Sequence, residues 1–424
     1  MSTTWDDIDE GLADPNWYRD GEPRAAFKRL RDEDPVHWTP AVTYGHGFWA
    51  LSRYDECKQL FADRVNYSIS RDMRLPRTVQ RLTSQQYADL GLHASLALMD
   101  PPRHTLFRAP VNKFFSVPQI GRMRQSVEST VDHLIDRIAA KGETEFVQEL
   151  AGDVPMFVVL GFLGVPPEHW ERIRLLVWRS FAPADPHYAI EGQTPEETSL
   201  QARHELIDFA REMTAQRRAE PADDFISVLA GLEVEGAHLD DSEISAWVNT
   251  IIVGGLETTR NAAAVGLWLF HQNRDQLALL QADPSLMGSA VDEVLRWVTP
   301  ARSRMRVARA DHQLGGKTIK AGDWVVPFIS SANRDEAVFH DPDAFDITRN
   351  PNPYLSFGDG IHRCLGRHLA RLELMVMFEK FFAAFPDFHV VDADKPDWIV
   401  DHVINGVSSL HVQLGPRATA EHAA

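Results

Sequence analysis

The chain of 424 residues contains only two cysteines, Cys57 and Cys364, and they are separated by most of the sequence. A disulfide framework or a thiolate zinc cage needs more cysteines than this. Long apolar runs are also missing, since the stretch WVNTIIVGGL breaks well before the ~18 apolar residues that a membrane-spanning helix requires. The start MSTTWDDIDE is polar and acidic, unlike a signal peptide. These features predict a soluble, cytoplasmic protein without a membrane span.

Positive charge is scarce as well. Lys and Arg total 43 against 61 Asp and Glu, which gives a formal net charge of −18. Proteins that bind nucleic acid need a basic face, so we expect no nucleic-acid partner. Hydrophobic residues make up 44% of the chain, which is ample for a core. Since no Ser/Gly linker or repeat divides the chain, we expect one domain spanning residues 1–424.

The hydrophobic pattern predicts a mainly α protein with a minor β part. Residues 239–273 run apolar without proline after Asp240 and Glu243, which have capping-box spacing, so they predict a long buried helix. A polar stretch with proline and glycine predicts a long loop at 181–199. The helical portion is expected over approximately 100–385. The β-rich portions are expected at approximately 35–70, 306–330 and 387–415.

The second cysteine follows a glycine-rich loop, FGDGIHRCLG (357–366). After it, apolar residues recur at four, three and four, which predicts a helix beginning at or just after Cys364. Free N–H groups at a helix start favour a thiolate, so we expect the pKa of Cys364 to lie below its ordinary value. A buried, inert cysteine is the alternative interpretation, and it suits Cys57 in RYDECKQL better.

The longer stretch FGDGIHRCLGRHLARLE resembles the haem-binding signature of the cytochrome P450 family. The resemblance implies a helix-rich prism around a buried haem, with small antiparallel sheets. It implies haem b (iron protoporphyrin IX) as the cofactor and Cys364 as the axial thiolate and metal ligand. Phe357 would pack beside the cysteine, Gly358 would let the cofactor lie close, and His362 would face a propionate.

The centre of the long helix carries a second resemblance. Its segment GGLETT (254–259) is similar to the oxygen-binding segment of the family. Gly255 would leave room over the haem. Thr258 would bond the carbonyl four residues back, opening a local bulge, and would hydrogen-bond oxygen. Glu257 would link Thr258 to bulk protons, so both residues are expected to be catalytic.

Two further segments resemble parts of the family that hold the cofactor. DPPRHTLFR (100–108) is similar to the segment whose His and Arg, here His104 and Arg108, reach the propionates. Arg306 matches another propionate arginine. Forked guanidinium groups suit carboxylates well.

An ion-pair motif completes the resemblance. Glu293 and Arg296 form an ExxR pair, and Arg349 matches the third member of a buried structural triad. We expect these three residues to serve the fold, not the chemistry.

The resemblance implies a monooxygenase that inserts one atom of O2 into a C–H bond of a hydrophobic substrate. Electrons would come from a separate ferredoxin and ferredoxin reductase, with Arg363, Arg367, Arg371, Arg103 and Lys113 as a candidate basic docking face. An ordinary solvated helix face is the alternative interpretation of these cations.

The stretches GGLETTRN and EVLRWVTP resemble bacterial members of the family that hydroxylate sterol side chains and branched lipids, and terpene hydroxylases share much of this. The resemblance therefore implies a sterol, branched lipid or terpenoid as the substrate class, with specificity residues at 68–96, 181–199 and 301–305 and on the long helix. Arg302 or Arg304 is a candidate partner of a substrate carboxylate, and the alternative interpretation is an arginine that forms a salt bridge within the protein or contacts a propionate. Two other functions stay open. A peroxide-dependent haem-thiolate hydroxylase would not need the acid–threonine pair, and a haem sensor would need no proton relay.

Overall fold

One long helix runs through the middle of the molecule, and the rest of the fold is built around it. The computed structural model describes residues 4–40, 46–70, 73–75 and 83–418. Helix α12 (Asp241–Gln272) has 32 residues, as predicted. The Asp240 carboxylate accepts a bond from the Glu243 N–H at 2.8 Å, and the Glu243 carboxylate accepts one from the Asp240 N–H at 3.0 Å. The capping box is therefore confirmed.

Helices form most of the structure. They are α1 (Trp5–Gly11), α2 (Arg24–Glu33), α3 (Tyr54–Ala62), α4 (Ser84–Asp89), α5 (Arg103–Arg108), α6 (Val117–Gly121), α7 (Arg124–Ala139), α8 (Asp153–Leu163), α9 (Trp170–Phe181), α10 (Pro195–Ala219), α11 (Phe225–Ala230), α12, α13 (Arg274–Ala282), α14 (Met287–Val298), α15 (Ile329–Ala332) and α16 (Arg367–Ala384). Helices α8, α9, α10, α14 and α16 all contact α12. Among the described residues, no helix combines the length and apolarity that crossing a bilayer requires.

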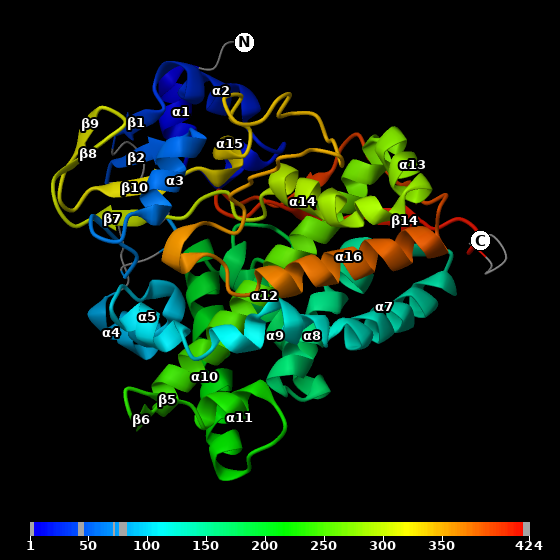
Figure 1. Ribbon diagram of the computed structural model, residues 1–424, viewed down its shortest axis with the longest axis horizontal. Helices are drawn as coiled ribbons and strands as arrows, with labels where there is room; N and C mark the ends of the chain where they lie inside the picture. The colour runs from blue at the N-terminus through cyan, green and yellow to red at the C-terminus, as the bar shows by residue number, and fades with distance from the viewer. Residues whose placement is uncertain (1–3, 41–45, 71–72, 76–82, 419–424) are drawn as a thin grey trace.

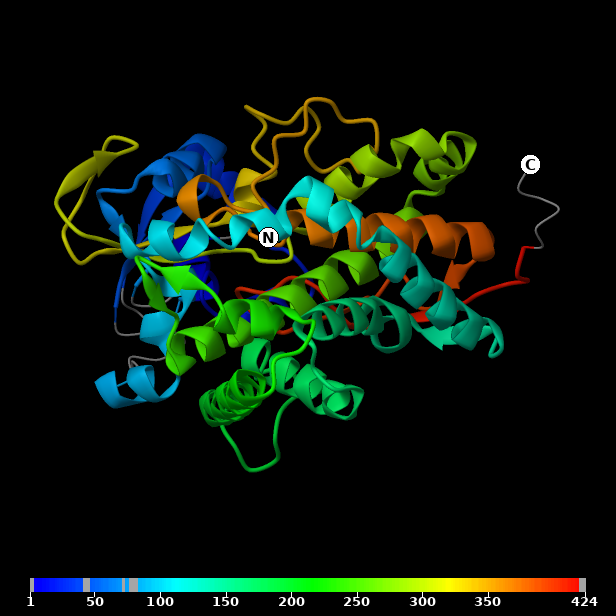
Figure 2. The ribbon, with the colours of Figure 1, turned by 60° about the horizontal axis from the view of Figure 1, so that its bottom comes forward.

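Short strands make up the β part. They are β1 (Val36–Thr39), β2 (Phe48–Leu51), β3 (Tyr67–Ser68), β4 (Glu143–Glu145), β5 (Glu233–Val234), β6 (Ala237–His238), β7 (Arg306–Ala308), β8 (His312–Leu314), β9 (Lys317–Ile319), β10 (Trp324–Pro327), β11 (His389–Val390), β12 (Asp397–Trp398), β13 (Val407–Ser409) and β14 (His411–Gln413). The largest sheet has the order β1-β2-β10-β7-β3, antiparallel except where β10 pairs with β2. Figures 1 and 2 place this sheet, with α1 to α3, at one end of the molecule. The predicted fold class, mainly α with small, largely antiparallel sheets, is confirmed.

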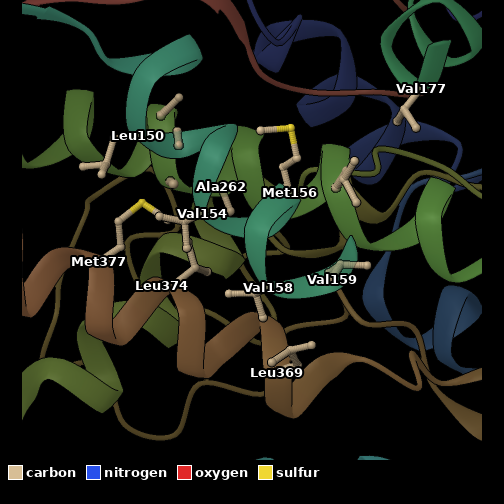
Figure 3. Packing of buried hydrophobic residues seen from close by; sticks show 14 of the residues in the cluster. Leu150, Val154, Met156, Val158, Val159, Val177, Ala262, Leu369, Leu374 and Met377 are labelled. Carbon is tan, nitrogen blue, oxygen red and sulfur yellow. The ribbon is translucent and has the colours of Figure 1, made fainter. Parts of the chain in front are cut away.

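The main hydrophobic core lies where α8 packs between α12 and α16. Figure 3 shows Val158 of α8 facing Leu369 of α16, with Val154 beside Leu374. Tight packing continues at Gly266 of α12, where a Cβ would lie 2.7 Å from the Phe378 ring. A core packed this closely holds α12 and α16 in fixed positions.

The predicted loop at 181–199 is too long at its C-terminal end. Helix α10 already begins at Pro195, because Thr194 and Glu197 form a capping box and proline suits the first helical position. The loop therefore ends at residue 194. The residues TPEE (194–197) indicate this helix start, but the polar composition of the segment favoured a loop.

Candidate functional site

A cavity of about 1500 Å³ lies between α12 and the loop that precedes α16. Ordinary ligand pockets measure about 300–1,000 Å³, so this cavity has room for a large flat group together with a substrate. Cys364 lines it from the loop side, and Gly255 and Thr258 line it from α12. Two segments that are far apart in the sequence, the middle of α12 and the cysteine loop, therefore line the same cavity.

The cysteine loop is held by a hydrogen bond within the loop and by others from Arg108 of α5. The Cys364 N–H donates to the Phe357 carbonyl at 2.8 Å. Arg108 donates to the Ile361 carbonyl at 2.9 Å, and also to that of Arg363. Gly358 has a φ of +64°, which favours glycine, and nothing lies within 4 Å of where its Cβ would be. The loop thus presents an unobstructed backbone surface beside the thiol.

The prediction that the helix start lowers the pKa of Cys364 is wrong in direction. Burial, the largest influence, raises the pKa above the ordinary value of a thiol. The Gly366 N–H and the nearby Arg108 and Arg367 act in the opposite sense but do not outweigh it. Helix α16 begins only at Arg367, so the helix start is three residues away from the sulfur. A bound metal ion would still deprotonate the thiol outright.

Cys57 is a core residue, as predicted. It is fully buried, its thiol donates to the Leu51 carbonyl at 3.6 Å, and burial raises its pKa well above the ordinary value.

On α12, the Thr258 hydroxyl donates to the Gly254 carbonyl at 2.9 Å, as predicted. The expected local bulge is absent, because the helix is α-helical throughout residues 241–272. The Gly254 carbonyl accepts the hydroxyl without any opening of the helix. Gly255 lines the cavity, and a Cβ there would press on Val159 at 3.1 Å, so helix packing also requires a small residue.

Glu257 faces away from the cavity into the protein. It is fully buried, and its carboxylate accepts bonds from Arg260 at 2.8 Å and from Asn261 at 3.0 Å. Arg260 in turn donates to the Tyr188 hydroxyl at 3.0 Å and lies over the Trp178 ring. To relay protons, Glu257 would have to break its ion pair with Arg260 and turn its carboxylate toward the cavity.

A cluster of basic side chains lies at one side of the cavity. The rings of His104 and His362 lie 4.1 Å apart. Burial, the largest cause, lowers the pKa of His104 to about 4 and of His362 to about 2, with neighbouring cations acting in the same direction. Both ring nitrogens of His104 are buried without a hydrogen-bond partner among the described residues. Arg108 and Arg306 line the cavity next to them.

These residues fit a haem. The cavity is large enough, its floor carries the Cys364 thiol, and its glycine-lined wall admits a flat group. The unpartnered His104 nitrogens, with Arg108 and Arg306 close by, suit the two propionate carboxylates.

The predicted structural triad is confirmed. Arg296 donates twice to the Glu293 carboxylate, at 2.7 and 2.8 Å, and Arg349 donates to it at 3.2 Å. All three side chains are buried or nearly so. Arg296 also donates to three backbone carbonyls, so the triad ties α14 to the long segment before the cysteine loop.

The predicted cationic docking face is only partly available. Arg371 pairs with Asp292 at 2.8 Å, and Arg103 pairs with Glu243 at 2.9 Å. Arg367 donates to the Cys364 carbonyl at 3.1 Å. Of the predicted set, Arg363 and Lys113 remain exposed without an ion pair among the described residues.

The two candidate substrate arginines have different positions. Arg302 is fully buried, pairs with Glu22 at 2.5 Å and donates to Asn405 at 2.9 Å, so it serves the fold. Arg304 lines the cavity. All the predicted specificity segments contribute residues to the cavity lining, although residues 71–72 and 76–82 of the segment 68–96 lie outside the described residues.

One cavity residue, Glu373, ends the stretch that resembles the haem-binding signature but was assigned no role from the sequence. Glu373 of α16 is 1% exposed, lines the cavity and hydrogen-bonds to Thr259. Burial raises its pKa to about 8, so it is largely a neutral acid at pH 7. Its position on the α16 face that carries Leu369 was the available signal, since an acidic residue inside an apolar helical stripe is unusual.

Comparisons with known proteins agree with this geometry. The family model described as Cytochrome P450 matches residues 75–399. A Steroid C26-monooxygenase of Mycobacterium tuberculosis is 36% identical over 390 residues, covering 91% of this chain and 92% of that protein.

Solved structures with a similar fold support the same family. Cytochrome P450 CYP268A2 of Mycobacterium marinum, in complex with pseudoionone, superposes with a TM-score of 0.84 at 31% identity, covering 92% of this chain and 94% of that one. CYP108D1 of Novosphingobium aromaticivorans superposes with a TM-score of 0.87 at 27% identity, covering 99% and 100%. The family model and these relatives show that the chain belongs to the cytochrome P450 family and is a haem-dependent monooxygenase of that family.

Proposed function

We propose that this chain binds haem b through Cys364 and inserts one oxygen atom from O2 into a C–H bond of a sterol, branched lipid or terpenoid. The observation that carries the proposal is that Cys364 of the cysteine loop and Thr258 of α12 line one large cavity. When bound, the haem supplies the iron that activates O2. The protein supplies the ligand, the protons and the position of the substrate.

Residues of the chain would hold the haem at both ends. Cys364 is the proposed iron ligand, with Phe357 and Gly358 beside it. His104 and His362 are neutral, because burial lowers their pKa values, so they would act as hydrogen-bond partners of the propionates. Arg108 and Arg306 would supply the charge that balances the two carboxylates.

Proton supply is proposed to run through α12. The Thr258 hydroxyl is held over the cavity by the Gly254 carbonyl, which fixes the direction of the Oγ atom. Because the hydroxyl has a single proton, it can accept a hydrogen bond from a group in the cavity while this bond is made, and it must turn from the Gly254 carbonyl before it donates to an oxygen there and is re-protonated. Glu257 is the proposed source of those protons, after its carboxylate is released from Arg260.

The electron donor is proposed to be a ferredoxin with its reductase. Arg363 belongs to the cysteine loop, Arg367 begins α16, and Lys113 is exposed, on a chain with a net charge of −18. A local basic patch on an acidic protein favours an acidic partner. Because Arg103 and Arg371 are already paired, the proposed docking face is smaller than the sequence indicated.

The substrate class rests on the cavity and on the relatives. Apolar side chains line part of the cavity, among them Val159 and Phe162 of α8 and Ile251 of α12. The relatives include proteins named for oxidation of a steroid, and one structural neighbour binds pseudoionone. Cytoplasmic location and a single domain over residues 1–424 remain predictions.

The carbon monoxide complex of the reduced protein tests the ligand. We expect a Soret band strongly shifted to the red in the wild type and its loss in Cys364→Ser. Cys57→Ala is the matched control, because it removes the other cysteine far from the cavity, and it should keep the band. A wild-type spectrum like that of a globin would contradict the proposal.

Turnover separates the alternative functions. With a surrogate ferredoxin, its reductase and NADPH, the monooxygenase should form hydroxylated product that contains one atom from ¹⁸O2. Product formed only with added hydrogen peroxide would favour the peroxide-dependent hydroxylase. A haem spectrum without product under either condition would favour a sensor.

A further inference from the structure

Arg304 brings a positive charge into the cavity without an acidic partner. Its only hydrogen bond among the described residues runs to the Ser303 carbonyl at 3.0 Å, which is a contact with its own neighbour in the chain. No ion pair joins it to a described carboxylate. Arg302, two residues earlier, pairs with Glu22 instead.

The Arg304 side chain lies deep in the protein, and its partly exposed surface belongs to the cavity lining. Burial is the main reason that its pKa falls to about 10, and the nearby Arg74 acts in the same direction. At pH 7 the guanidinium is nevertheless charged. A buried charge without a counterion is costly, so an arginine in this setting favours the binding of an anion.

The neighbouring cations already have partners. Arg74 donates to the Asp401 carboxylate at 3.0 and 3.2 Å. Arg108 and Arg306 are the proposed partners of the two haem propionates, and together they balance that charge. Arg304 is therefore a further cavity cation, in addition to the two arginines assigned to the haem propionates.

We propose that Arg304 binds the carboxylate of an amphiphilic substrate whose apolar body extends toward Thr258. A planar guanidinium can hold a carboxylate through two parallel N–H···O bonds, which fixes the direction of the attached chain. Apolar residues that line the same cavity, such as Leu295 and Met305, would cover the body of the molecule. The substrate class is then a monocarboxylic acid with a branched-lipid, sterol or terpenoid skeleton, oxidised at a carbon remote from its carboxylate. This inference rests on the proposed function and names the substrate class of the same site.

Matched pairs of acid and neutral ligand test the inference. The probes are palmitic acid with hexadecanol, and lithocholic acid with its methyl ester. Binding to the ferric holoprotein is followed by the spin-state change of the haem and by calorimetry. We expect at least one acid to bind the wild type about 10- to 100-fold more tightly than its neutral counterpart, as expected for a charge-assisted hydrogen bond in a buried site.

Arg304→Gln keeps the length of the side chain and removes its charge. It should abolish the preference for the acid, leave the affinity for the neutral partner unchanged, and keep the ratio of haem to protein. Arg304→Lys should restore part of the preference. Arg203→Gln is the matched control, since Arg203 also lines the cavity but comes from another element, α10.

Three results would overturn the inference. In the first, neither acid binds the wild type better than its neutral partner. In the second, Arg203→Gln and not Arg304→Gln removes the preference. In the third, Arg304→Gln releases haem without changing the preference, which would make Arg304 a propionate partner. None of these results affects the red-shifted carbon monoxide band of the wild type, so the proposed function is judged separately.

Discussion

Because the buried Glu373 carboxyl is neutral, we predict that the free energy of unfolding of this protein depends on pH. The unfolded chain releases this proton near the ordinary glutamate pKa of 4.5, whereas burial keeps it on the folded protein until about pH 8. Between these values the folded state binds more protons than the unfolded state. The free energy of unfolding must therefore fall as the pH rises through this window.

The structure sets the size of the effect. Raising the pKa of a carboxyl from 4.5 to about 8 corresponds to a cost on the order of 4–5 kcal/mol once the folded protein must carry the charge. The unpartnered Oε1 atom of Glu373 explains why so little offsets burial. Glu373→Gln has nearly the same shape and no proton to lose. Relative to the wild type, the variant should therefore gain stability steadily from pH 5 to pH 8.

Thermal unfolding of the ferric holoprotein at several pH values measures this difference. Glu379→Gln is the matched control, because Glu379 lies on the same helix but pairs with Arg124 near the surface. Its melting temperature should differ from that of the wild type by a nearly constant amount across the same window. If the Glu373→Gln and wild-type curves run parallel, Glu373 is already ionised and the reasoning is refuted.

Three further predictions concern the proton route, the triad and the docking face. Thr258→Ala should lower product per NADPH by about tenfold or more and release hydrogen peroxide, while Thr258→Ser keeps the hydroxyl and the coupling; unchanged coupling in the alanine variant would contradict the proposed role. Arg296→Met should cost about 3–5 kcal/mol in denaturant unfolding because it leaves the buried Glu293 charge with the more distant Arg349 as its only cation, and the double variant Glu293→Met/Arg296→Met should recover part of that loss; two additive losses would count against an ion-pair origin. Reduction by ferredoxin should slow steeply with salt in the wild type and less steeply in Arg363→Gln, and a flat salt response in both would remove the docking proposal.

Features with a local cause were predictable from the sequence. The spacing of apolar residues after Cys364 gave α16, and Asp240 with Glu243 gave the start of α12. The Thr258 bond to Gly254 follows from helix geometry alone, since it joins residues four apart. Each of these depends on a few neighbouring residues, so no knowledge of the rest of the chain was needed.

Features that depend on distant partners were not predictable. Arg103 meets Glu243 across 140 residues, so its loss from the docking face is invisible in the sequence. Arg302 and Arg304 would share one side of a regular strand, yet the segment around them makes only isolated bridges and sends them to different surroundings. The prediction for the pKa of Cys364 was wrong for a related reason, because the sequence reveals the helix start but not how deeply the thiol is buried.

The contact between Gly360 and α3 has a consequence for the size of any functional fragment. Gly360 sits in the cysteine loop with a φ of +66°, and a Cβ there would collide with the carbonyl oxygen of Phe61. The end of α3 therefore supports the cysteine loop directly. Although the helical half of the chain contains Cys364 and Thr258, removing residues 1–62 would remove that support and leave the position of the proposed iron ligand less firmly fixed.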